Sequence, residues 1–202
     1  MGEYGVTVIG LTGRCCAGKS YVGSLLEKEG IAVIEVDRLG HKALSSAKEQ
    51  IVKEFGATVL NSDGEIERKK VGEIVFSDLN KLKKLEAIIH PAMVLECENL
   101  IKEYKEGKTK AVVINAALLQ KMGLDKLCDT VIYAYAPSCI RFKRAVKRDK
   151  ATVSSFRRIE KAQKGIRFRD LKGHRETYIV HIWLSEAFIY RQVHKVCATI
   201  MS

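Results

Sequence analysis

The stretch VIGLTGRCCAGKSYVGSLLEKEGIAVIEVD, residues 8–37, decides the fold. The apolar run at residues 6–11 is rich in β-branched side chains, which is typical of a strand buried on both faces. Residues 20–30 repeat apolar side chains at helical spacing and end at a glycine, the usual stop of a helix. Residues 31–36 are a second short apolar strand. Strand, helix and strand in about thirty residues predict a βαβ unit, hence a parallel sheet with a right-handed crossover.

The rest of the sequence continues this alternation of strands and helices. Three further apolar segments are predicted to be strands: residues 110–115, 129–135 and 177–184. Helices are predicted over most of 48–107, around a polar turn at 61–65, and over 138–149, 152–163 and from the last strand to about residue 200. Pro91 should start or kink a helix. The pattern predicts a doubly wound α/β domain with a parallel sheet of about five strands.

Length and composition favour a compact intracellular protein. The chain has 202 residues, of which 47% are hydrophobic, enough to build one core. No apolar run approaches the ~20 residues of a membrane helix, and the N-terminus, with Glu3, lacks the basic region of a signal peptide. The six cysteines form no C-x-x-C pair, which favours free thiols in a reducing cytoplasm. We therefore expect a cytoplasmic location and no membrane partner.

The bend between the first strand and helix carries the chemistry. Residues 13–20, GRCCAGKS, fit the phosphate-binding pattern G-x-x-x-x-G-K-[ST] in the context that the pattern requires. The glycines let backbone N–H groups face a phosphate, and the helix adds its positive dipole end. Lys19 is expected to reach the β- and γ-phosphates of ATP, and the Ser20 hydroxyl to bind Mg²⁺. We expect nucleotide contacts from Gly13, Cys16, Ala17, Gly18, Lys19, Ser20 and Tyr21.

The class of nucleotide enzyme follows from what accompanies this loop. A GTPase would normally carry an N-K-x-D base-reading motif, which the sequence lacks, so a small-molecule kinase fits better. Cys15 and Cys16 occupy variable positions of the loop. Their thiols are either inert fillers or, at a helix start, thiolates of lowered pKa that make ATP binding sensitive to oxidation.

Positive charge is concentrated in one segment. The formal net charge is +11, and residues 141–175 hold fourteen Lys and Arg against three acidic residues, Asp149, Glu160 and Asp170. Such a field attracts polyanions, including nucleic acid and small phosphorylated substrates. Phe142, Phe156 and Phe168 are too scattered for a base-stacking platform, so nucleic-acid binding stays the weakest alternative.

Four segments together resemble the dephospho-coenzyme A kinase family: VIGLTGRCCAGKS (8–20), IAVIEVDRLGHKAL (31–44), residues 63–94 with DGEIERKKVGEIVF and LEAIIHPAMV, and LLQKMGLD (118–125). The resemblance is clear over residues 6–124 and loose afterwards. It implies a kinase that transfers the γ-phosphate of ATP to the ribose 3′-hydroxyl of dephospho-CoA, the last step of CoA synthesis. It also implies a P-loop kinase core, a helical CoA-binding region over 38–107 and a basic lid over about 141–165.

The resemblance assigns roles to several side chains. Asp37 matches the aspartate that acts on the accepting hydroxyl, and a carboxylate at the carboxyl end of a parallel strand can take that proton. The alternative for Asp37 is a helix N-cap. His41, Arg68 and His90 match substrate-site positions. A lone histidine is more often a packing or hydrogen-bonding residue, and a solvated helix face would explain Arg68 equally well. Glu35 replaces a first aspartate and would hold Mg²⁺ only through water.

Arginines of the basic segment are expected to cover the phosphates. Arg144 and Arg148 lie four residues apart on one helical face, at the R-x-x-x-R-D pattern of the family with Asp149. Arginine stabilises the charge of a phosphoryl transition state, and Arg144 is our choice for the residue nearest the phosphates. The alternative is a charged helix that only faces solvent.

Departures from the family pattern leave a second function open. The P-L-L-x-E pattern appears as Ala117–Lys121, without its proline and glutamate, and TYIVHIWLSEAF lacks the expected D-N-x-G near the adenine end. Asn115 offers no carboxylate to a metal at the end of the third strand. A divergent nucleotide-binding homologue with a changed or lost acceptor is therefore the alternative. The sequence gives no oligomeric state.

Overall fold

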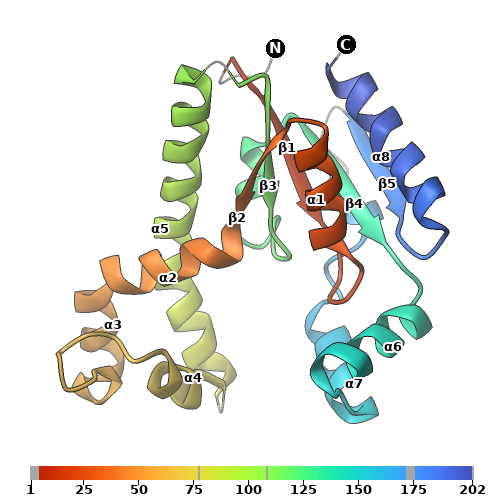
Figure 1. Cartoon of the computed structure of the whole chain (residues 1–202). Helices are drawn as coiled ribbons and strands as arrows, with labels where there is room; N and C mark the ends of the chain where they lie inside the picture. Colours follow the sequence, from red (N-terminus) through yellow and green to blue (C-terminus); the bar gives the residue numbers. More distant parts are fainter. Residues whose placement is uncertain (1–4, 77, 108, 172–175, 202) are drawn as a thin grey trace. The chain divides into compact units, whose positions relative to one another are not determined.

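Figure 1 shows the computed structural model of the chain, which describes residues 5–76, 78–107, 109–171 and 176–201. The chain divides into two compact units, which we treat separately. Met1–Ile34 and Leu100–Ser202 form the first unit, and Glu35–Asn99 form the second. Within the described ranges, no helix combines the length and apolarity needed to cross a membrane.

The first unit is built on a five-stranded parallel sheet of order β2-β3-β1-β4-β5. The strands are β1 (Thr7–Thr12), β2 (Ala32–Glu35), β3 (Ala111–Asn115), β4 (Thr130–Tyr135) and β5 (Glu176–His181). The central strand β1 pairs in parallel with β3, where Leu11 lies opposite Asn115, and with β4, where Thr12 lies opposite Tyr133. The predicted doubly wound parallel sheet is therefore confirmed.

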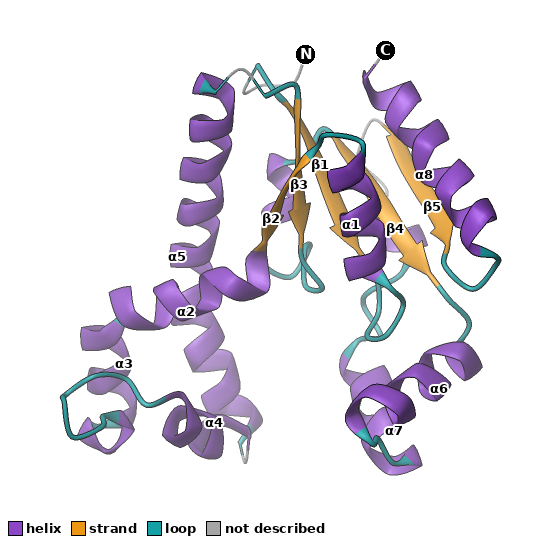
Figure 2. Ribbon diagram, in the orientation of Figure 1, coloured by secondary structure: helices purple, strands orange, loops and turns teal. Residues whose placement is uncertain are grey.

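Two helices cover one face of this sheet (Figure 2). α1 (Lys19–Lys28) and α8 (Glu186–Met201) share a buried core with alternate residues of the strands. Ile9 of β1, Ile132 of β4 and Val180 of β5 belong to that core, whereas Val8 and Val131 are fully buried on the other face. Burial on both faces explains why the strand sequences are almost continuously apolar.

The basic segment forms the two predicted helices. α6 (Ser138–Asp149) and α7 (Val153–Ala162) meet at Lys150, which has a left-handed φ of 51°, and Thr152 begins α7 with a capping box to Ser155. Two short 3₁₀ helices, η2 (Leu124–Leu127) and η3 (Phe168–Leu171), complete the unit. Lys172 and Arg175 of this segment lie outside the described residues.

The second unit is helical with a small core of its own. It contains α2 (Val36–Ser46), α3 (Lys48–Phe55), the 3₁₀ helix η1 (Ala57–Val59), α4 (Arg68–Phe76) and most of α5 (Leu79–Glu106). Ile51, Val59, Val71 and Leu85 pack together there. Asn61 Oδ1 accepts the backbone N–H of Asp63 and Glu65, which fixes the predicted polar turn. Pro91 lies inside α5 and does not start a helix.

Candidate functional site

The phosphate-binding loop connects β1 to α1, and its shape depends on residues with positive φ. Gly13 has φ 155°, and a Cβ there would lie 2.5 Å from the carbonyl oxygen of Ala134. Gly18 precedes α1 with φ 107°, and a Cβ there would lie 2.6 Å from Cγ2 of Ile182. Cys16 also has a positive φ, 59°, in the left-handed region. The loop therefore follows the backbone path that the glycine spacing predicts.

The start of α1 presents the polar end of the motif. Lys19 is the first residue of α1, and Ser20 follows with an exposed side chain. Among the residues that the structure describes, no side chain caps this helix start, and the first turn of α1 contains no Asp or Glu. Backbone N–H groups and the dipole end are thus available for an anion. Tyr21 is half-buried and packs its ring against the core of the first unit.

Arg144 of α6 contacts the loop directly. Its Nη1 donates to the carbonyl oxygens of Cys16, at 3.3 Å, and Ala17, at 2.8 Å, and its Nη2 donates to the carbonyl of Ile182. Arginine has five N–H donors, so donors remain beyond these three bonds. The structure thus places Arg144 at the loop, as a residue that fixes loop carbonyls.

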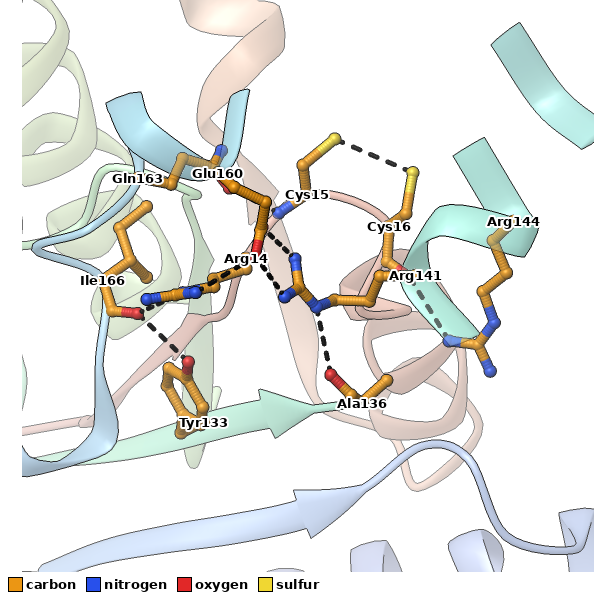
Figure 3. Close-up of polar contacts among 10 residues, drawn as sticks. All are labelled: Arg14, Cys15, Cys16, Tyr133, Ala136, Arg141, Arg144, Glu160, Gln163 and Ile166. Atoms are coloured by element: carbon orange, nitrogen blue, oxygen red, sulfur yellow. Dashed lines mark hydrogen bonds and ion pairs between the residues drawn. The ribbon is translucent and has the colours of Figure 1, made fainter. Parts of the chain in front are cut away.

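A charged cluster holds the other side of the loop (Figure 3). Glu160 of α7 accepts from Arg141, with Nη2 to Oε2 at 2.8 Å and a second, shorter bond from Nη1. The same carboxylate accepts from Nη1 of Arg14 in the loop at 3.3 Å. Arg141 also donates to the carbonyl of Ala136, which ties the cluster to the end of β4.

The electrostatics of this cluster favour the charged forms. Hydrogen bonding from Arg141 holds the pKa of Glu160 below its usual range, against the opposing effect of burial. The same bond raises the pKa of Arg141, whose side chain is 4% exposed. Because both partners are ionised and bonded, the cluster can fix Arg14 in one position.

The segment after α7 binds the loop backbone as well. The Cys15 N–H donates to Oε1 of Gln163 at 2.7 Å, and Nε of Arg14 donates to the carbonyl of Ile166 at 3.1 Å. Tyr133 on β4 donates to the same carbonyl, also at 3.1 Å. Residues 160–166 thus form a brace along one side of the loop, and we call them the loop brace.

The two loop cysteines lie side by side, with their Sγ atoms 3.7 Å apart. Burial, followed by the neighbouring Cys15, raises the pKa of the Cys16 thiol above its usual value. This direction opposes the interpretation of Cys16 as a thiolate of lowered pKa and favours an inert filler. Free cysteines also occur at buried positions 97 and 197.

Arg148, the second predicted lid arginine, pairs with its neighbour. Its Nη2 lies 2.7 Å from Oδ2 of Asp149, and its Nε bonds both carboxylate oxygens of that residue. The side chain is 64% exposed. No hydrogen bond among the described residues joins Arg148 to the loop, although burial, which raises the pKa of the Cys16 thiol, is opposed by the charge of Arg148, which lowers it. The role of Arg148 toward phosphate stays a prediction.

The acceptor-site candidates lie in the second unit. Asp37 is exposed in the first turn of α2, two residues after β2 ends, and Glu35 occupies the N-cap position instead. A carboxylate in the first turn is favoured by the helix dipole. Arg68 at the start of α4 donates to Nε2 of His41 at 2.8 Å, so these two candidates are joined. His90 is half-buried on α5, just before Pro91.

The residues that could hold a metal are few. Among the described residues no three His, Cys, Asp or Glu side chains come together as a metal-binding group. Asn115 ends β3 beside Leu11 of β1 and is 4% exposed. A magnesium ion needs few protein ligands when substrate phosphates complete its shell, and the exposed Ser20 hydroxyl at the start of α1 fits that pattern.

Sequence reasoning missed the loop brace. Arg14 is one of the variable positions of the phosphate-binding pattern, and Arg141 is one of many cations in the basic segment. Nothing in the sequence around Gln163 indicates a contact with the loop. Glu160 did carry one, because it is one of only three acids within a segment of fourteen cations. A carboxylate isolated in that way is expected to have specific cationic partners.

Comparison with known proteins agrees with this geometry. The sequence profile of the family described as dephospho-CoA kinase matches residues 7–172. The chain is 37% identical to a dephospho-CoA kinase of Fusobacterium nucleatum, over 78% of this chain and 81% of that protein. It is 34% identical to a dephospho-CoA kinase of Aquifex aeolicus, over 93% and 94% of the two chains.

Solved structures share the fold of this chain. The crystal structure of TT1252 from Thermus thermophilus superposes with a TM-score of 0.79 at 25% identity, covering 98% of each chain. A dephospho-CoA kinase from Campylobacter jejuni superposes with a TM-score of 0.64 at 25% identity, covering 96% of this chain and 97% of that one. The profile match and the curated relatives show that the chain belongs to the dephospho-CoA kinase family.

Proposed function

We propose that this protein is an ATP-dependent kinase that phosphorylates the ribose 3′-hydroxyl of dephospho-CoA, giving CoA and ADP. The observation that carries the proposal is the glycine-bent loop between β1 and α1, in a chain of this family. The reaction needs a grip on a triphosphate and a group that takes the proton of the attacking hydroxyl. We expect it to take place in the cytoplasm.

The loop supplies the grip on ATP. Backbone N–H groups at the start of α1 and the dipole end of that helix offset the phosphate charge, and Lys19 reaches the β- and γ-oxygens. When bound, Mg²⁺ neutralises charge on the phosphate oxygens, and the Ser20 hydroxyl is the protein ligand that we assign to it. Arg144 acts as a positioning residue for the loop carbonyls and has donors left for a phosphate oxygen.

Asp37 is the group that we assign to the acceptor hydroxyl. Its carboxylate follows a strand end and has the exposure that substrate access requires. It would accept the 3′-hydroxyl proton as the bond from that oxygen to the γ-phosphorus forms and the bond to ADP breaks. The bonded pair of His41 and Arg68 is our candidate for contact with the dephospho-CoA phosphates, with His90 as a further substrate contact.

Residues 117–121, which depart from the P-L-L-x-E pattern of the family, still make hydrogen bonds with other parts of the first unit. Gln120, within that segment, donates to the carbonyl of Asp170 at 2.6 Å. Thr12 at the end of β1 donates to the carbonyl of Ala117. These bonds give the segment a structural role that does not depend on the missing glutamate. Turnover therefore decides whether the acceptor has changed.

The direct experiment is to incubate the purified protein with Mg-ATP and dephospho-CoA and measure CoA and ADP. Asp37→Asn should lower kcat about 100-fold or more, because general-base catalysis contributes roughly 10²–10⁴, while ATP affinity stays within threefold. Lys19→Ala should lower kcat/KM by at least about 100-fold through lost phosphate stabilisation.

Matched variants separate these effects from nonspecific damage. Asp63→Asn removes an exposed carboxylate of the 61–65 turn, and Lys28→Ala removes an exposed lysine at the other end of α1. Both should leave kcat and KM within twofold. Tight ATP binding without CoA formation would instead identify a homologue with a changed or lost acceptor. An unchanged rate for Asp37→Asn would remove its assigned role.

A further inference from the structure

A cavity of about 810 Å³ opens beside the loop in the first unit, and neither Lys19 nor Ser20 is among the described residues that line it. Its wall includes Tyr133 and Tyr135 of β4 and Ile179 and His181 of β5. The alternating residues of these strands, such as Ile132 and Val180, belong to the core with α1 and α8. The cavity therefore lies on the sheet face opposite α1, since successive strand residues point to opposite faces.

Aromatic side chains line two parts of this cavity. The Phe168 ring lies 6.2 Å from the Tyr133 ring in an edge-to-face arrangement, and the Phe168 side chain is 38% exposed. The Tyr135 ring lies 5.5 Å from the His181 ring, and Tyr135 is 40% exposed. Partly exposed rings around a hollow leave faces and edges that a flat ligand can contact.

The cavity wall is also strongly positive. Four arginines line it, Arg14, Arg141, Arg167 and Arg169, against one carboxylate, Glu160. Glu160 is shared by Arg14 and Arg141, so the two other guanidinium groups are not neutralised by it. Asp170 lies 3.8 Å from Arg169, a long ion pair at an exposed position. The summed charge favours an anion.

The size of the cavity suits a small molecule. The volume lies within the roughly 300–1,000 Å³ of small-molecule sites.

We infer that this cavity is a second ligand site, which binds a flat aromatic ring that carries a phosphate or carboxylate. The ring would lie among Tyr135, Phe168 and His181, and its anionic group would face Arg167 and Arg169. Arginine pairs with either anion through two parallel N–H bonds and also stacks on rings. The inference concerns a ligand other than the ATP that the loop holds.

The cavity is separate from the phosphate end of α1 but connected to the loop. Lys19 and Ser20 do not line it, whereas Arg14 and Ala17 of the loop do. Glu160 of the loop brace forms part of the wall and accepts a hydrogen bond from the Arg14 side chain, and Gln163 of the brace accepts one from the Cys15 N–H of the loop. Because the two sites share only part of the loop, we expect each ligand to change the affinity of the other by the same factor, no more than about tenfold, so that the probe still binds when the ATP analogue is present.

The test uses 1-naphthyl phosphate as a probe and inorganic phosphate as the ring-free comparison. The full chain is first saturated with Mg²⁺ and a non-hydrolysable ATP analogue, so that the loop is occupied. We expect saturable fluorescence changes with a Kd below about 1 mM for 1-naphthyl phosphate, and binding at least about tenfold weaker for inorganic phosphate, because the ring contributes part of the affinity.

Variants locate the probe. Phe168→Ala and Arg169→Gln change exposed positions and should each weaken the probe at least fivefold. Arg158→Gln, an exposed arginine of α7 that does not line the cavity, should leave the Kd within twofold. The inference would be overturned if all three variants bound 1-naphthyl phosphate with the same Kd, or if the wild type showed no saturable binding of it. Probe binding that disappears with the ATP analogue would also overturn it, since the probe would then occupy the loop.

The outcome is independent of the kinase reaction. If the protein makes no CoA but binds 1-naphthyl phosphate in this variant-dependent way, the proposed function fails and the second site stands. If it makes CoA but does not bind the probe, the second site is wrong and the kinase function stands.

Discussion

The phosphate loop and the loop brace, residues 160–166, meet at Arg14 and Cys15, yet they keep their shapes by different means. Gly13 and Gly18 have positive φ angles, which glycine adopts without strain. Neighbouring atoms also lie too close to both residues to leave room for a Cβ. The brace consists of ordinary backbone whose side chains, Glu160 and Gln163, bond to the loop.

This difference separates two kinds of sensitivity. Replacing a loop glycine would displace the loop itself, because the new Cβ would collide with the backbone of β4 or with a buried side chain. A changed brace residue would leave the path intact and remove only an external support. A substitution of a loop glycine should therefore weaken ATP binding strongly, whereas a substitution in the brace should weaken it only moderately.

The largest expected effect comes from Gly13→Ala. The new Cβ would lie 2.5 Å from the Ala134 carbonyl oxygen, a backbone atom of the neighbouring strand, so the loop must shift. We expect at least about 100-fold weaker ATP binding and a loss of roughly 1–3 kcal/mol of unfolding free energy. Isothermal titration with ATP and urea unfolding measure the two effects.

Gly30→Ala is the matched control. Gly30 also has a positive φ, 80°, but apart from its chain neighbours no atom of the described residues lies within 4 Å of a Cβ built there. Only the conformational cost of about 1 kcal/mol should appear, with ATP affinity unchanged. Similar ATP affinities for the two variants would contradict the view that backbone crowding fixes the loop.

A smaller effect is expected for Glu160→Gln in the brace. The amide keeps the size of the side chain but loses the charge that Arg141 and Arg14 share. We expect KM for ATP to rise about three- to tenfold with kcat within twofold, since the support and not the chemistry is weakened. Glu103→Gln, an exposed carboxylate of α5, should change neither constant. A fall in kcat of about 100-fold for Glu160→Gln would contradict the view that the brace only supports the loop.

A still smaller effect is expected in the pH dependence of the unfolding free energy, to which the Glu160 carboxylate contributes. The pKa of Glu160 is lowered in the folded state, chiefly by the hydrogen bond from Arg141. Its contribution is therefore complete above the unfolded pKa of about 4.3 and is lost as pH falls through the lower folded value. The difference in unfolding free energy between the wild type and Glu160→Gln should be constant from pH 6 to 8 and shrink below about pH 4. A difference that grows toward acid would contradict the assignment.

The comparison also explains what the sequence could predict. The loop, the five strands and the helices α6 and α7 follow from local rules of hydrophobic period, glycine spacing and capping, all readable from neighbouring residues. The last strand ends at His181 and not at residue 184, because the chain turns there to begin α8. Pro91 does not start a helix, because α5 continues through it, and the alternative that it kinks the helix stays a prediction.

The side-chain contacts of the site could not be predicted in this way. Glu160 and Arg14 are 146 positions apart, and Gln163 and Cys15 are 148 apart, so no local pattern joins them. Arg144 was predicted near the phosphates from its spacing, and its bonds to the carbonyls of Cys16 and Ala17 depend on how α6 packs beside the loop. The sequence indicated which residues are charged, and the tertiary fold decides which of them meet.

The smallest expected effect concerns thiol reactivity, and it distinguishes the loop surface from the core. Burial raises the pKa of Cys97 to about 12 and that of Cys197 to about 11, so neither thiol should react with iodoacetamide in the native protein at pH 8. Cys139 on α6 is exposed and should react first, with Cys15 and Cys16 slower. Bound Mg-ATP should slow Cys15 and Cys16 further and leave Cys139 unchanged, as peptide mass spectrometry over time would measure. A faster reaction at Cys16 than at Cys139 would mean that the loop is more open, and its thiol more acidic, than the contacts from Arg144 and Gln163 imply.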